Sequence, residues 1–555
     1  MKNMQKKSQN SLPNLRSQHP WKRIEELIKN SKQKILKPGF NCWTCDHADR
    51  VSFLIDTAIY HHAFTKAVLQ AKRSIYISGW DIKTYTKIRD IDKPYETIAL
   101  IDLLNQILEK NPHLHIYILC WKWTVLFLPD REFLAAIKWR IKSHKRLHFR
   151  FDSMHPMGGS HHQKLVIIDQ VMAFCGGIDL TDERWDTPGH DIKSHHRHNA
   201  KGKTYRPHHD IQIAIDGPVV KSLSSLFHEL WYRCTGEHLE YHRPIPSPWP
   251  HSLKTHLLQV TLGISRTFPW KSYEVKNLLS DAIRSAKDYI YIENQYFSWV
   301  GAFELLGRQL LKPKGPEIII ILPRFYRGKM EKLAIGKLTA QLIEALRSLD
   351  LYHRLGVFYP DLGETSLDNA IKVHSKILLV DGKFVKVGSA NFSNRSMSID
   401  TECDIALESD GNSRTESCIE SLLFELLAEH HGCQKELLKK ETKKTGSILT
   451  AIKNTSGDRL RKLEPLQFPA SRLFKSFSPL LMAVDPPASW WFMAKNWRTS
   501  YQYYQFLKKI RLLGIKNHAE LELELELELE LELKREAEED QQRIHGVDLD
   551  MEDKS

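Results

Sequence analysis

The sequence lacks the features that mark secreted scaffolds and integral membrane proteins. Its 555 residues include only eight cysteines, scattered along the chain, which are too few for a disulfide framework. No stretch of 18 or more apolar residues occurs, so we expect no membrane-spanning helix. The first thirty residues are polar and basic and contain no apolar core of a secretion signal. These absences predict a cytoplasmic protein, and export by a signal-independent secretion system stays open as the alternative.

Basic charge is abundant and unevenly distributed. The chain has 80 Lys and Arg against 67 Asp and Glu, a formal net charge of +13. Residues 1–38 carry +8 and residues 517–555 carry −11, so residues 39–516 carry +16. This excess of positive charge predicts an anionic partner, such as phosphate, nucleic acid or a membrane surface.

An internal repeat organises most of the chain. Apolar strand-like runs alternate with helical segments, which predicts an α/β fold with a largely buried sheet. Several runs recur in the same order about 200 residues later, so we interpret the chain as two homologous halves. The clearest pairs are Ala71–Ile77 with Ala286–Ile292, Ile116–Leu119 with Ile319–Leu322, and Leu165–Asp169 with Ile377–Asp381.

Composition predicts where these halves begin and end. Residues 467–512 mix Trp and Tyr with Lys and Arg, which fits either an interfacial membrane anchor or the core of a packed subdomain. A Glu-Leu dipeptide repeated seven times, from Glu520 to Leu533, has no function that its sequence indicates. The predicted segments are a basic flexible segment (1–40), the first half (41–250), the second half (251–432), a basic aromatic-rich region (433–516), and the Glu-Leu repeat with an acidic tail (517–555).

Both halves contain the pattern His-x-Lys-x4-Asp. A single copy would be weak evidence, because three common residues match by chance in many chains of this length. Two copies at equivalent places in a repeat, each followed by Gly seven residues after the Asp, form a strong signal. The six motif residues are His162, Lys164 and Asp169 in the first half and His374, Lys376 and Asp381 in the second.

The spacing of the motif places His and Lys on one face of a strand. Residues two apart point to the same side, so the two His and two Lys converge if the halves meet face to face. Asp169 and Asp381 have the opposite parity and are expected to point away as supports. Lysines can neutralise a phosphodiester, one neutral imidazole can attack phosphorus, and a protonated one can donate to the leaving oxygen. This chemistry predicts an enzyme that needs no metal and no cofactor.

A nucleophilic histidine needs an acceptor on its second ring nitrogen to fix its tautomer. The repeat offers one acidic residue per half, each at the start of a strand that follows the motif. We therefore predict that Asp210 orients His162 and that Glu402 orients His374.

With these residues in place, the chain resembles the phospholipase D superfamily over about residues 41–432. The second motif continues into Gly388-Ser389-Ala390-Asn391, as is typical of that family, whereas the first reads Gly176-Gly177-Ile178-Asp179. That departure resembles phosphatidylcholine-cleaving members rather than the nucleases. Four further segments also resemble those phosphatidylcholine-cleaving members. They are Gly79-Trp80-Asp81, Arg184–His190, His209-Asp210-Ile211 with Gly217-Pro218, and Ile290–Phe297.

The resemblance implies a fold and further site residues. The expected fold is two α-β-α sandwich halves with mixed sheets, related by a pseudo-twofold axis, with one active site at their interface. His162 is the expected nucleophile and His374 the expected general acid. Asp179, Ser389 and Asn391 are expected to support the site, and Trp80, Gln295 and Tyr296 to line the substrate pocket.

The implied activity is hydrolysis of phosphatidylcholine-like lipids to phosphatidic acid and the headgroup alcohol through a covalent phosphohistidine. An alcohol should replace water, so transphosphatidylation is expected. The expected partner is phospholipid at an anionic membrane surface, bound peripherally by a monomer, with no nucleic acid. The alternatives are a cardiolipin-synthase-like phosphatidyltransferase or a nuclease of the same superfamily, and a non-catalytic membrane- or nucleic-acid-binding module.

Two other groups of potential ligands receive simpler interpretations. Cys42-x2-Cys45 with His47 lacks the second half of a zinc site, so no metal is predicted there. A group of histidines between Asp179 and Asp210 is interpreted as a solvated loop at the rim of the site, with phosphate or headgroup contact as the alternative. Its members are His190, His195, His196, His198, His208 and His209.

Overall fold

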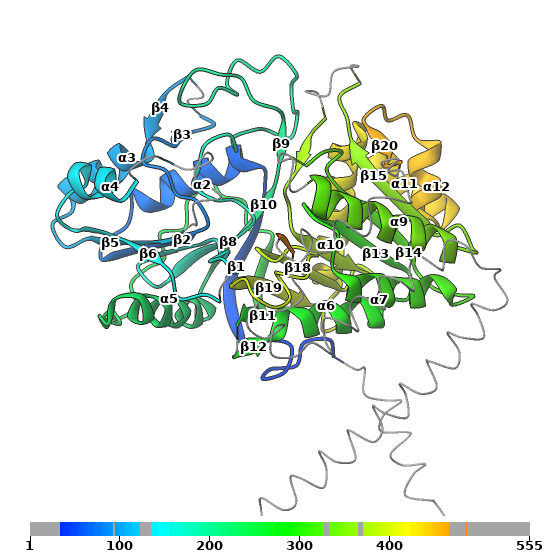
Figure 1. The fold of residues 1–555 in the computed structure, drawn as a ribbon, viewed down its shortest axis with the longest axis horizontal. Coiled ribbons are helices and arrows are strands. Elements are labelled where there is room, and N and C mark those ends of the chain that lie inside the picture. Colours follow the sequence, from blue (N-terminus) through cyan, green and yellow to red (C-terminus); the bar gives the residue numbers. More distant parts are fainter. Residues whose placement is uncertain are drawn as a thin grey trace, which may run out of the picture.

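One mixed β-sheet runs through both halves of the protein in the computed structural model (Figure 1). Within the described residues this sheet has 16 strands, and helices cover both of its faces. The fold class is therefore α/β, as predicted. The structure describes residues 34–92, 95–122, 132, 135–156, 158–269, 271–326, 332–363, 370–464 and 484–485.

The strand order of the first half is repeated in the second. In each half, four antiparallel pairings lead outward from the centre of the sheet and two parallel pairings complete it. The first half runs β1 (Thr44–Ile55), β10 (Ile211–Asp216), β8 (Met172–Gly176), β7 (Leu165–Ile168), β2 (Ser74–Gly79), β5 (His115–Trp121) and β6 (Leu147–Asp152). The second runs β11 (Leu257–Phe268), β19 (Glu402–Glu408), β18 (Phe384–Gly388), β17 (Ile377–Val380), β13 (Tyr289–Glu293), β14 (Glu317–Ile321) and β15 (Leu355–Pro360).

The two halves join edge to edge through β1 and β11. These two long strands pair antiparallel, from Thr44 opposite Ile264 to Val51 opposite Leu257. Their pairing makes one sheet out of what the repeat predicts as two. Short strands outside this order are β3 (Lys87–Arg89) with β4 (Thr97–Ala99), β9 (His208–His209) with β16 (Lys372–Val373), and β12 (Ser272–Tyr273) on β11.

Helices pack on both faces of each half and enclose three apolar cores. One long helix per half contributes to the central core, and the outer faces carry the two flanking cores. The central helices are α5 (Val219–Thr235) and α10 (Ser413–His431). The outer helices are α2 (Thr57–Val68), α3 (Leu100–Lys110) and α4 (Ala135–Lys142) in the first half, and α6 (Glu274–Ser285), α7 (Val300–Leu311), the π-helix η2 (Lys332–Gly336) and α9 (Lys337–Leu349) in the second.

The local sequence explains these elements. Strands β2 and β13 are buried on both faces, which requires the near-continuous apolar runs that the repeat preserves. Helices α3 and α6 bury one apolar stripe and expose charged residues on the other side. The repeated runs at residues 71–77 and 116–119 contribute to strands β2 and β5, as the predicted alternation of strands and helices requires.

Residues beyond 432 continue the second half in space. Helices α11 (Lys435–Thr445) and α12 (Ile448–Asn454) follow α10, and β20 (Leu460–Lys462) adds a strand to the edge of the sheet at β15. The buried carboxylate of Asp485 accepts a hydrogen bond from Ser298 Oγ at 2.6 Å. Apart from residues 484–485, the aromatic-basic stretch 467–512 and the Glu-Leu repeat lie outside the described residues. Among the helices that are described, none combines the length and apolar character needed to cross a bilayer.

Candidate active site

Each motif histidine is held by a carboxylate from the opposite half. His162 Nδ1 lies 2.9 Å and 3.0 Å from the two carboxylate oxygens of Glu402. His374 Nδ1 lies 2.7 Å from Asp210 Oδ2. With Nδ1–H donated to a carboxylate, the free nitrogen of each ring is Nε2, which is the form a nucleophile or proton carrier needs. The predicted pairing within each half, Asp210 with His162 and Glu402 with His374, is therefore wrong.

Backbone contacts set this crossed arrangement. The amide of His162 donates to the carbonyl of Thr401 at 3.0 Å, and the amide of His374 donates to the carbonyl of His209 at 2.8 Å. Each motif thus pairs with the residue immediately before the opposite carboxylate. The parallel pairing of β9 with β16 and the single bridge between His161 and Thr401 extend these contacts. Asp210 and Glu402 hold equivalent places in the two halves, so the sequence alone could not show whether each carboxylate serves the histidine of its own half or of the opposite one.

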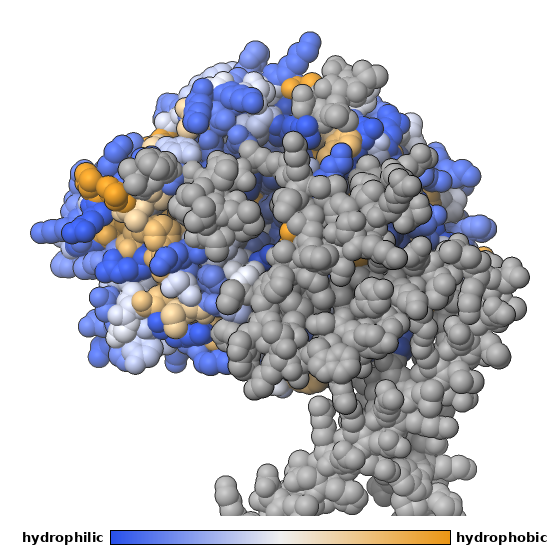
Figure 2. All heavy atoms as spheres, viewed as in Figure 1, coloured by the Kyte–Doolittle hydropathy of each residue, from blue (hydrophilic) through white to orange (hydrophobic). Residues whose placement is uncertain are grey.

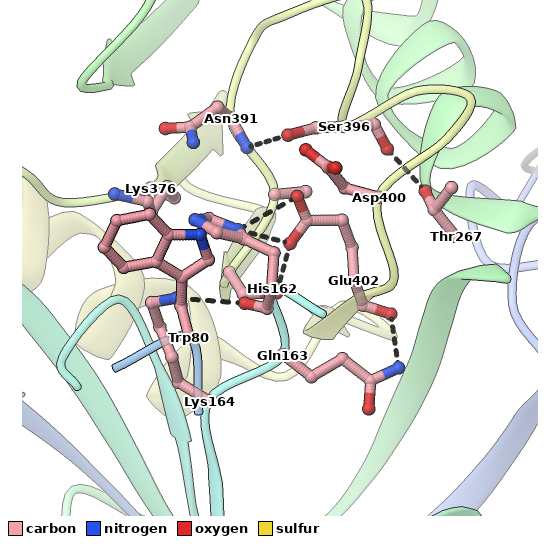
Figure 3. A network of polar contacts seen from close by, with 12 residues as sticks. Trp80, His162, Gln163, Lys164, Thr267, Lys376, Asn391, Ser396, Asp400 and Glu402 are labelled. Carbon is pink, nitrogen blue, oxygen red and sulfur yellow. Dashed lines mark hydrogen bonds and ion pairs between the residues drawn. The ribbon is translucent and has the colours of Figure 1, made fainter. Parts of the chain in front are cut away.

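The two lysines lie beside their histidines, as the strand spacing predicts. Lys164 Nζ donates to the carbonyl of His162 at 3.0 Å, and Lys376 Nζ donates to the carbonyl of His374. All four side chains are largely buried, with 13% of the His162 side chain and 6% of the His374 side chain exposed. Figure 3 shows His162, Lys164 and Lys376 close together, with the indole of Trp80 beside them. The structure therefore brings both motifs into one site.

The lysines differ in their counter-charges. Lys164 Nζ forms an ion pair with Asp179 Oδ2 at 3.1 Å. Lys376 Nζ instead donates to the neutral amide oxygen of Gln295 at 3.2 Å. Burial therefore lowers the pKa of Lys376 to about 7, although the Asp210 carboxylate opposes the shift. Position 391, which corresponds to Asp179 in the repeat, is the neutral Asn391.

Burial also favours the neutral forms of the other titratable groups. It lowers the pKa of both His162 and His374 well below the usual range, and the adjacent lysines add to this effect. Burial and the nearby Asp400 carboxylate raise the pKa of Glu402 to about 7. Burial likewise raises the pKa of Asp210. An anionic substrate bound in the site would favour the protonated forms of the motif lysines and histidines.

Gly177 and Ser389 occupy equivalent positions and show why the two motifs differ. Ser389 Oγ donates to Glu402 Oε2 at 2.6 Å, so it supports the carboxylate that holds His162. A Cβ atom at Gly177 would overlap with the carboxylate of Asp210. The first copy therefore has Gly where the second has Ser, because Asp210 occupies the space that a side chain would need.

The motif aspartates Asp169 and Asp381 point away from the imidazoles. Asp169 accepts hydrogen bonds from the amides of residues 72–74, at 2.6–3.0 Å. Asp381 accepts the equivalent bonds from the amides of residues 287–289, at 2.8–2.9 Å. Each carboxylate ties the end of its motif strand to the start of the neighbouring strand, β2 or β13, which agrees with the supporting role that their spacing predicts.

The predicted pocket residues lie on both sides of the motifs. Trp80 stacks on Trp121 with ring centroids 5.5 Å apart, and its amide donates to Asp179 Oδ1 at 2.7 Å. Gln295 contacts Lys376 through its oxygen and donates to the hydroxyl of Tyr296 at 2.9 Å. The side-chain oxygen of Asn391 is buried and has no hydrogen-bond partner among the described residues (Figure 3).

Asp400 is a site residue that the sequence reasoning missed. Its carboxylate acts on Glu402, whose pKa it raises, and it forms an ion pair with Arg395 at 2.6 Å. It also accepts a hydrogen bond from the amide of Ser160 at 2.7 Å, so it links the second half to the segment that precedes His162. No motif marks Asp400, and its place two residues before Glu402 was the only available signal.

The histidine group between Asp179 and Asp210 is not uniformly solvated. His195 is exposed, and His196 and His198 are partly exposed. His190, His208 and His209 are buried, so the prediction of a solvated loop is wrong for these three. The reason is a set of acidic residues from distant segments that lies around His190 and His209.

These acidic residues form a buried network with the two histidines. Glu429 lies 2.5 Å from His209 Nδ1 and 3.1 Å from His190 Nε2. Although burial opposes the change, nearby carboxylates, Asp56 foremost, raise the pKa of His190 to about 10. Glu429 and Glu293 raise the pKa of His209 against the same opposition.

The geometry of this network would also suit a cation. The ligand atoms of Asp56, His190, His209 and Glu429 lie within 4.8 Å of one another, so a cation that displaced the imidazole protons would find oxygen and nitrogen donors. At the separate CxxC segment, Cys42 Sγ and Cys45 Sγ lie 3.4 Å apart, while His47 bonds to Gln259.

Comparison with known proteins agrees with this geometry. Residues 67–245 match the family model described as phospholipase D, and residues 279–421 match the model described as cardiolipin synthase, PLD-like domain. Similar curated proteins include phospholipase D alpha 1 of Carica papaya, 25% identical over 483 residues, and phospholipase D alpha 3 of Arabidopsis thaliana, 25% identical over 482 residues. Each alignment covers 61% of this chain, which spans 59% and 58% of those two relatives. Phospholipase D A of Dictyostelium discoideum is 24% identical over 440 residues, covering 65% of this chain and 33% of that relative.

A solved structure has a similar fold. The phosphatidylserine synthase of Haemophilus influenzae Rd KW20 superposes with a TM-score of 0.51 at 14% sequence identity. The match covers 78% of this chain and 99% of that protein. This likeness supports the α/β fold described above.

Proposed function

The chain belongs to the phospholipase D superfamily, and we propose that it hydrolyses phosphatidylcholine-like glycerophospholipids to phosphatidic acid and the free headgroup alcohol. One observation carries the proposal. Each half supplies a carboxylate that holds the imidazole of the other half, and a lysine lies beside each imidazole. This set of groups suits a phosphodiester whose charge increases in the transition state.

In the first step of the proposed reaction, His162 Nε2 attacks the phosphorus atom. The P–O bond to the headgroup breaks as a P–N bond forms, and His374 donates its Nε2 proton to the leaving oxygen. Glu402 stabilises the positive charge that develops on His162. The ammonium groups of Lys164 and Lys376 bind the non-bridging oxygens, so the charge that a metal would supply comes from the protein.

In the second step, His374 accepts a proton from water, and the resulting oxygen nucleophile attacks phosphorus. The P–N bond breaks, phosphatidic acid leaves, and His162 returns to its neutral form. Asp210 stabilises His374 whenever its ring is protonated. Because an alcohol can enter in place of water, the same intermediate supports transphosphatidylation.

The experiment is incubation of the purified protein with phosphatidylcholine, with and without ethanol. Release of choline and phosphatidic acid, with phosphatidylethanol when ethanol is present, supports the proposal. His162→Asn should abolish both products, whereas His195→Asn, at an exposed position, should leave them unchanged. Hydrolysis that gives no phosphatidylethanol would contradict the covalent route, and absence of any lipid turnover would contradict the function.

Phosphatidyl transfer is a second candidate, favoured by the match of residues 279–421 to the cardiolipin synthase-like model. Its chemistry would differ only in the second step, where a lipid hydroxyl would replace water. Phosphatidylglycerol supplied as the only lipid distinguishes the two. Formation of cardiolipin and glycerol would favour transfer, and formation of phosphatidic acid and glycerol would favour hydrolysis.

A further inference from the structure

Helix α4 presents an apolar face to solvent. Ile137 and Ile141 lie one turn apart on the same side of the helix, with 48% and 76% of their surface exposed. Figure 2 shows hydrophobic surface where α4 lies in Figure 1, among hydrophilic neighbours. Single exposed apolar residues are ordinary in proteins, but two on one helical face form a small patch that water solvates poorly.

The opposite face of α4 is firmly packed, so the exposure is not the result of a loosely attached helix. Ala135 and Trp139 are buried, and Trp139 stacks on Phe149 with ring centroids 5.4 Å apart and an interplanar angle of 7°. The helix therefore holds Ile137 and Ile141 in a fixed outward orientation.

Basic residues surround the two isoleucines. Arg140, Lys142 and Lys145 are exposed, and none of them forms an ion pair within the part of the chain that the structure describes. Lys138 is paired with Glu132 at 3.2 Å. The helix itself contains no acidic residue. An apolar face bordered by unpaired cations is complementary to an anionic lipid surface, which accepts apolar side chains and attracts Lys and Arg.

The helix is also connected to the active site through the two strands that it joins. Strand β5 ends at Trp121, which stacks on Trp80. Strand β6 ends at Asp152, which accepts a hydrogen bond from His161, the neighbour of His162. Because β5 and β6 are parallel, the connecting helix runs in the opposite direction. The N-terminal end of α4 therefore lies toward the carboxyl ends of β5 and β6, which are the strand ends that contact the site.

We propose that the exposed side of α4, where Arg140 and Lys142 flank Ile137 and Ile141, docks the protein on anionic phospholipid bilayers. This inference rests on the proposed lipid substrate and names a surface through which the enzyme reaches it. The isoleucines enter the interfacial region of the bilayer, while the cations contact lipid phosphates.

The test separates docking from catalysis. Co-flotation measures binding to vesicles of phosphatidylcholine alone and of phosphatidylcholine with about 30% phosphatidylglycerol. The variants are Ile137→Ser/Ile141→Ser and Arg140→Gln/Lys142→Gln. The matched control is Leu258→Ser on β11, where 47% of the leucine is exposed. Thermal unfolding confirms that each variant is folded, and turnover of a water-soluble short-chain phosphatidylcholine below its micelle concentration measures catalysis without a bilayer.

We expect the wild type to bind anionic vesicles more strongly than neutral ones, and each α4 double variant to weaken that binding by about tenfold. Leu258→Ser should bind like the wild type, and all variants should turn over the short-chain lipid at the wild-type rate. Vesicle binding that is unchanged in both α4 variants would overturn the docking proposal, even if the short-chain lipid is hydrolysed. A change of oligomeric state in the α4 variants, without a change in vesicle binding, would overturn it in favour of a second copy as the partner. Binding that depends on α4 without any turnover would support docking and contradict the proposed function.

Discussion

His162 of the first half and Glu402 of the second half form a hydrogen-bonded pair at 2.9 Å, and Asp210 and His374 repeat the pair in the opposite direction at 2.7 Å. Each motif imidazole thus depends on the half that does not contain its motif. A displacement of one half relative to the other would misalign both histidines at once. The antiparallel pairing of β1 with β11, which joins the two halves, therefore contributes to the geometry of the site as well as to the stability of the sheet.

The crossed pairing predicts which histidine responds to each carboxylate substitution. Glu402→Gln should change the ring-nitrogen signals of His162, and Asp210→Asn those of His374. An amide can either accept from Nδ1 or donate to it, so it no longer selects one tautomer as a carboxylate does. Nitrogen NMR of histidine-labelled protein checks this, with His162→Asn and His374→Asn to assign the signals. Each carboxylate variant should lower kcat by about 10²–10⁴-fold. If Glu402→Gln altered His374 alone, the crossed arrangement would be refuted.

The lowered pKa of Lys376 predicts loss of activity in mildly alkaline solution. As pH rises through about 7, its ammonium loses the proton that binds the phosphate, so kcat/KM should fall. Lys376→Arg should be slower overall but should keep its activity to higher pH, because a guanidinium stays protonated. The measurement is the pH profile of kcat/KM for a short-chain lipid. An identical alkaline limb in both proteins would rule out Lys376 as its origin.

Deprotonation of Lys376 does not itself destabilise the fold in that alkaline range. The folded-state pKa of Lys376 lies below its unfolded value of 10.5, so the unfolded state binds more protons between about pH 7 and 10.5. Its contribution to the free energy of unfolding therefore rises with pH in this window, by at most about 1.4 kcal/mol per pH unit. Denaturant titrations of the wild type and Lys376→Met should reveal this difference in slope.

The difference between Gly177 and Ser389 predicts unequal results for reciprocal substitutions. Gly177→Ser should displace Asp210 and reduce kcat by at least about 10²-fold, because His374 loses its support. Ser389→Gly should have a smaller effect of about tenfold, because it removes only one hydrogen bond to Glu402. Steady-state kinetics on the short-chain lipid provide the measurement. Equal effects of the two substitutions would show that overlap with Asp210 is not what excludes a side chain at position 177.

The buried network predicts a strong contribution of Glu429 to stability. Glu429→Gln leaves two protonated histidines with less negative charge and should reduce the free energy of unfolding by about 3–5 kcal/mol near neutral pH. His209 foremost lowers the pKa of Glu429 to about 2, against the effect of burial. The stabilisation is therefore complete above the unfolded value of 4.5 and disappears as pH falls toward 2. Denaturant unfolding at several pH values should show the two proteins converging in acid. Glu425→Gln, at an exposed position on the same helix, is the control.

The sequence predicted much of the fold and most of the residues of the site. It did not predict that each motif histidine takes its carboxylate partner from the opposite half. Strand periodicity was sufficient for the repeat, for the shared face of His162 and Lys164, and for the outward direction of Asp169. It could not show that Glu402 serves His162, because that depends on how the two halves meet in space. Asp400 carries no motif. His190 and His209 looked solvated because their local sequence is polar, and only folding places Glu429 beside them.

The exchange of carboxylates between the halves has a consequence for how such a chain can arise. A polypeptide with one copy of the motif would hold a histidine without its own partner, and two such polypeptides would complete each other only as a symmetric homodimer. Joining the copies in one chain removes the need for assembly at low concentration. It also frees the two copies to diverge, so that one lysine can face Asp179 while the other faces a neutral amide. A fused pair can thus divide nucleophile and acid between sites that symmetry would force to be identical.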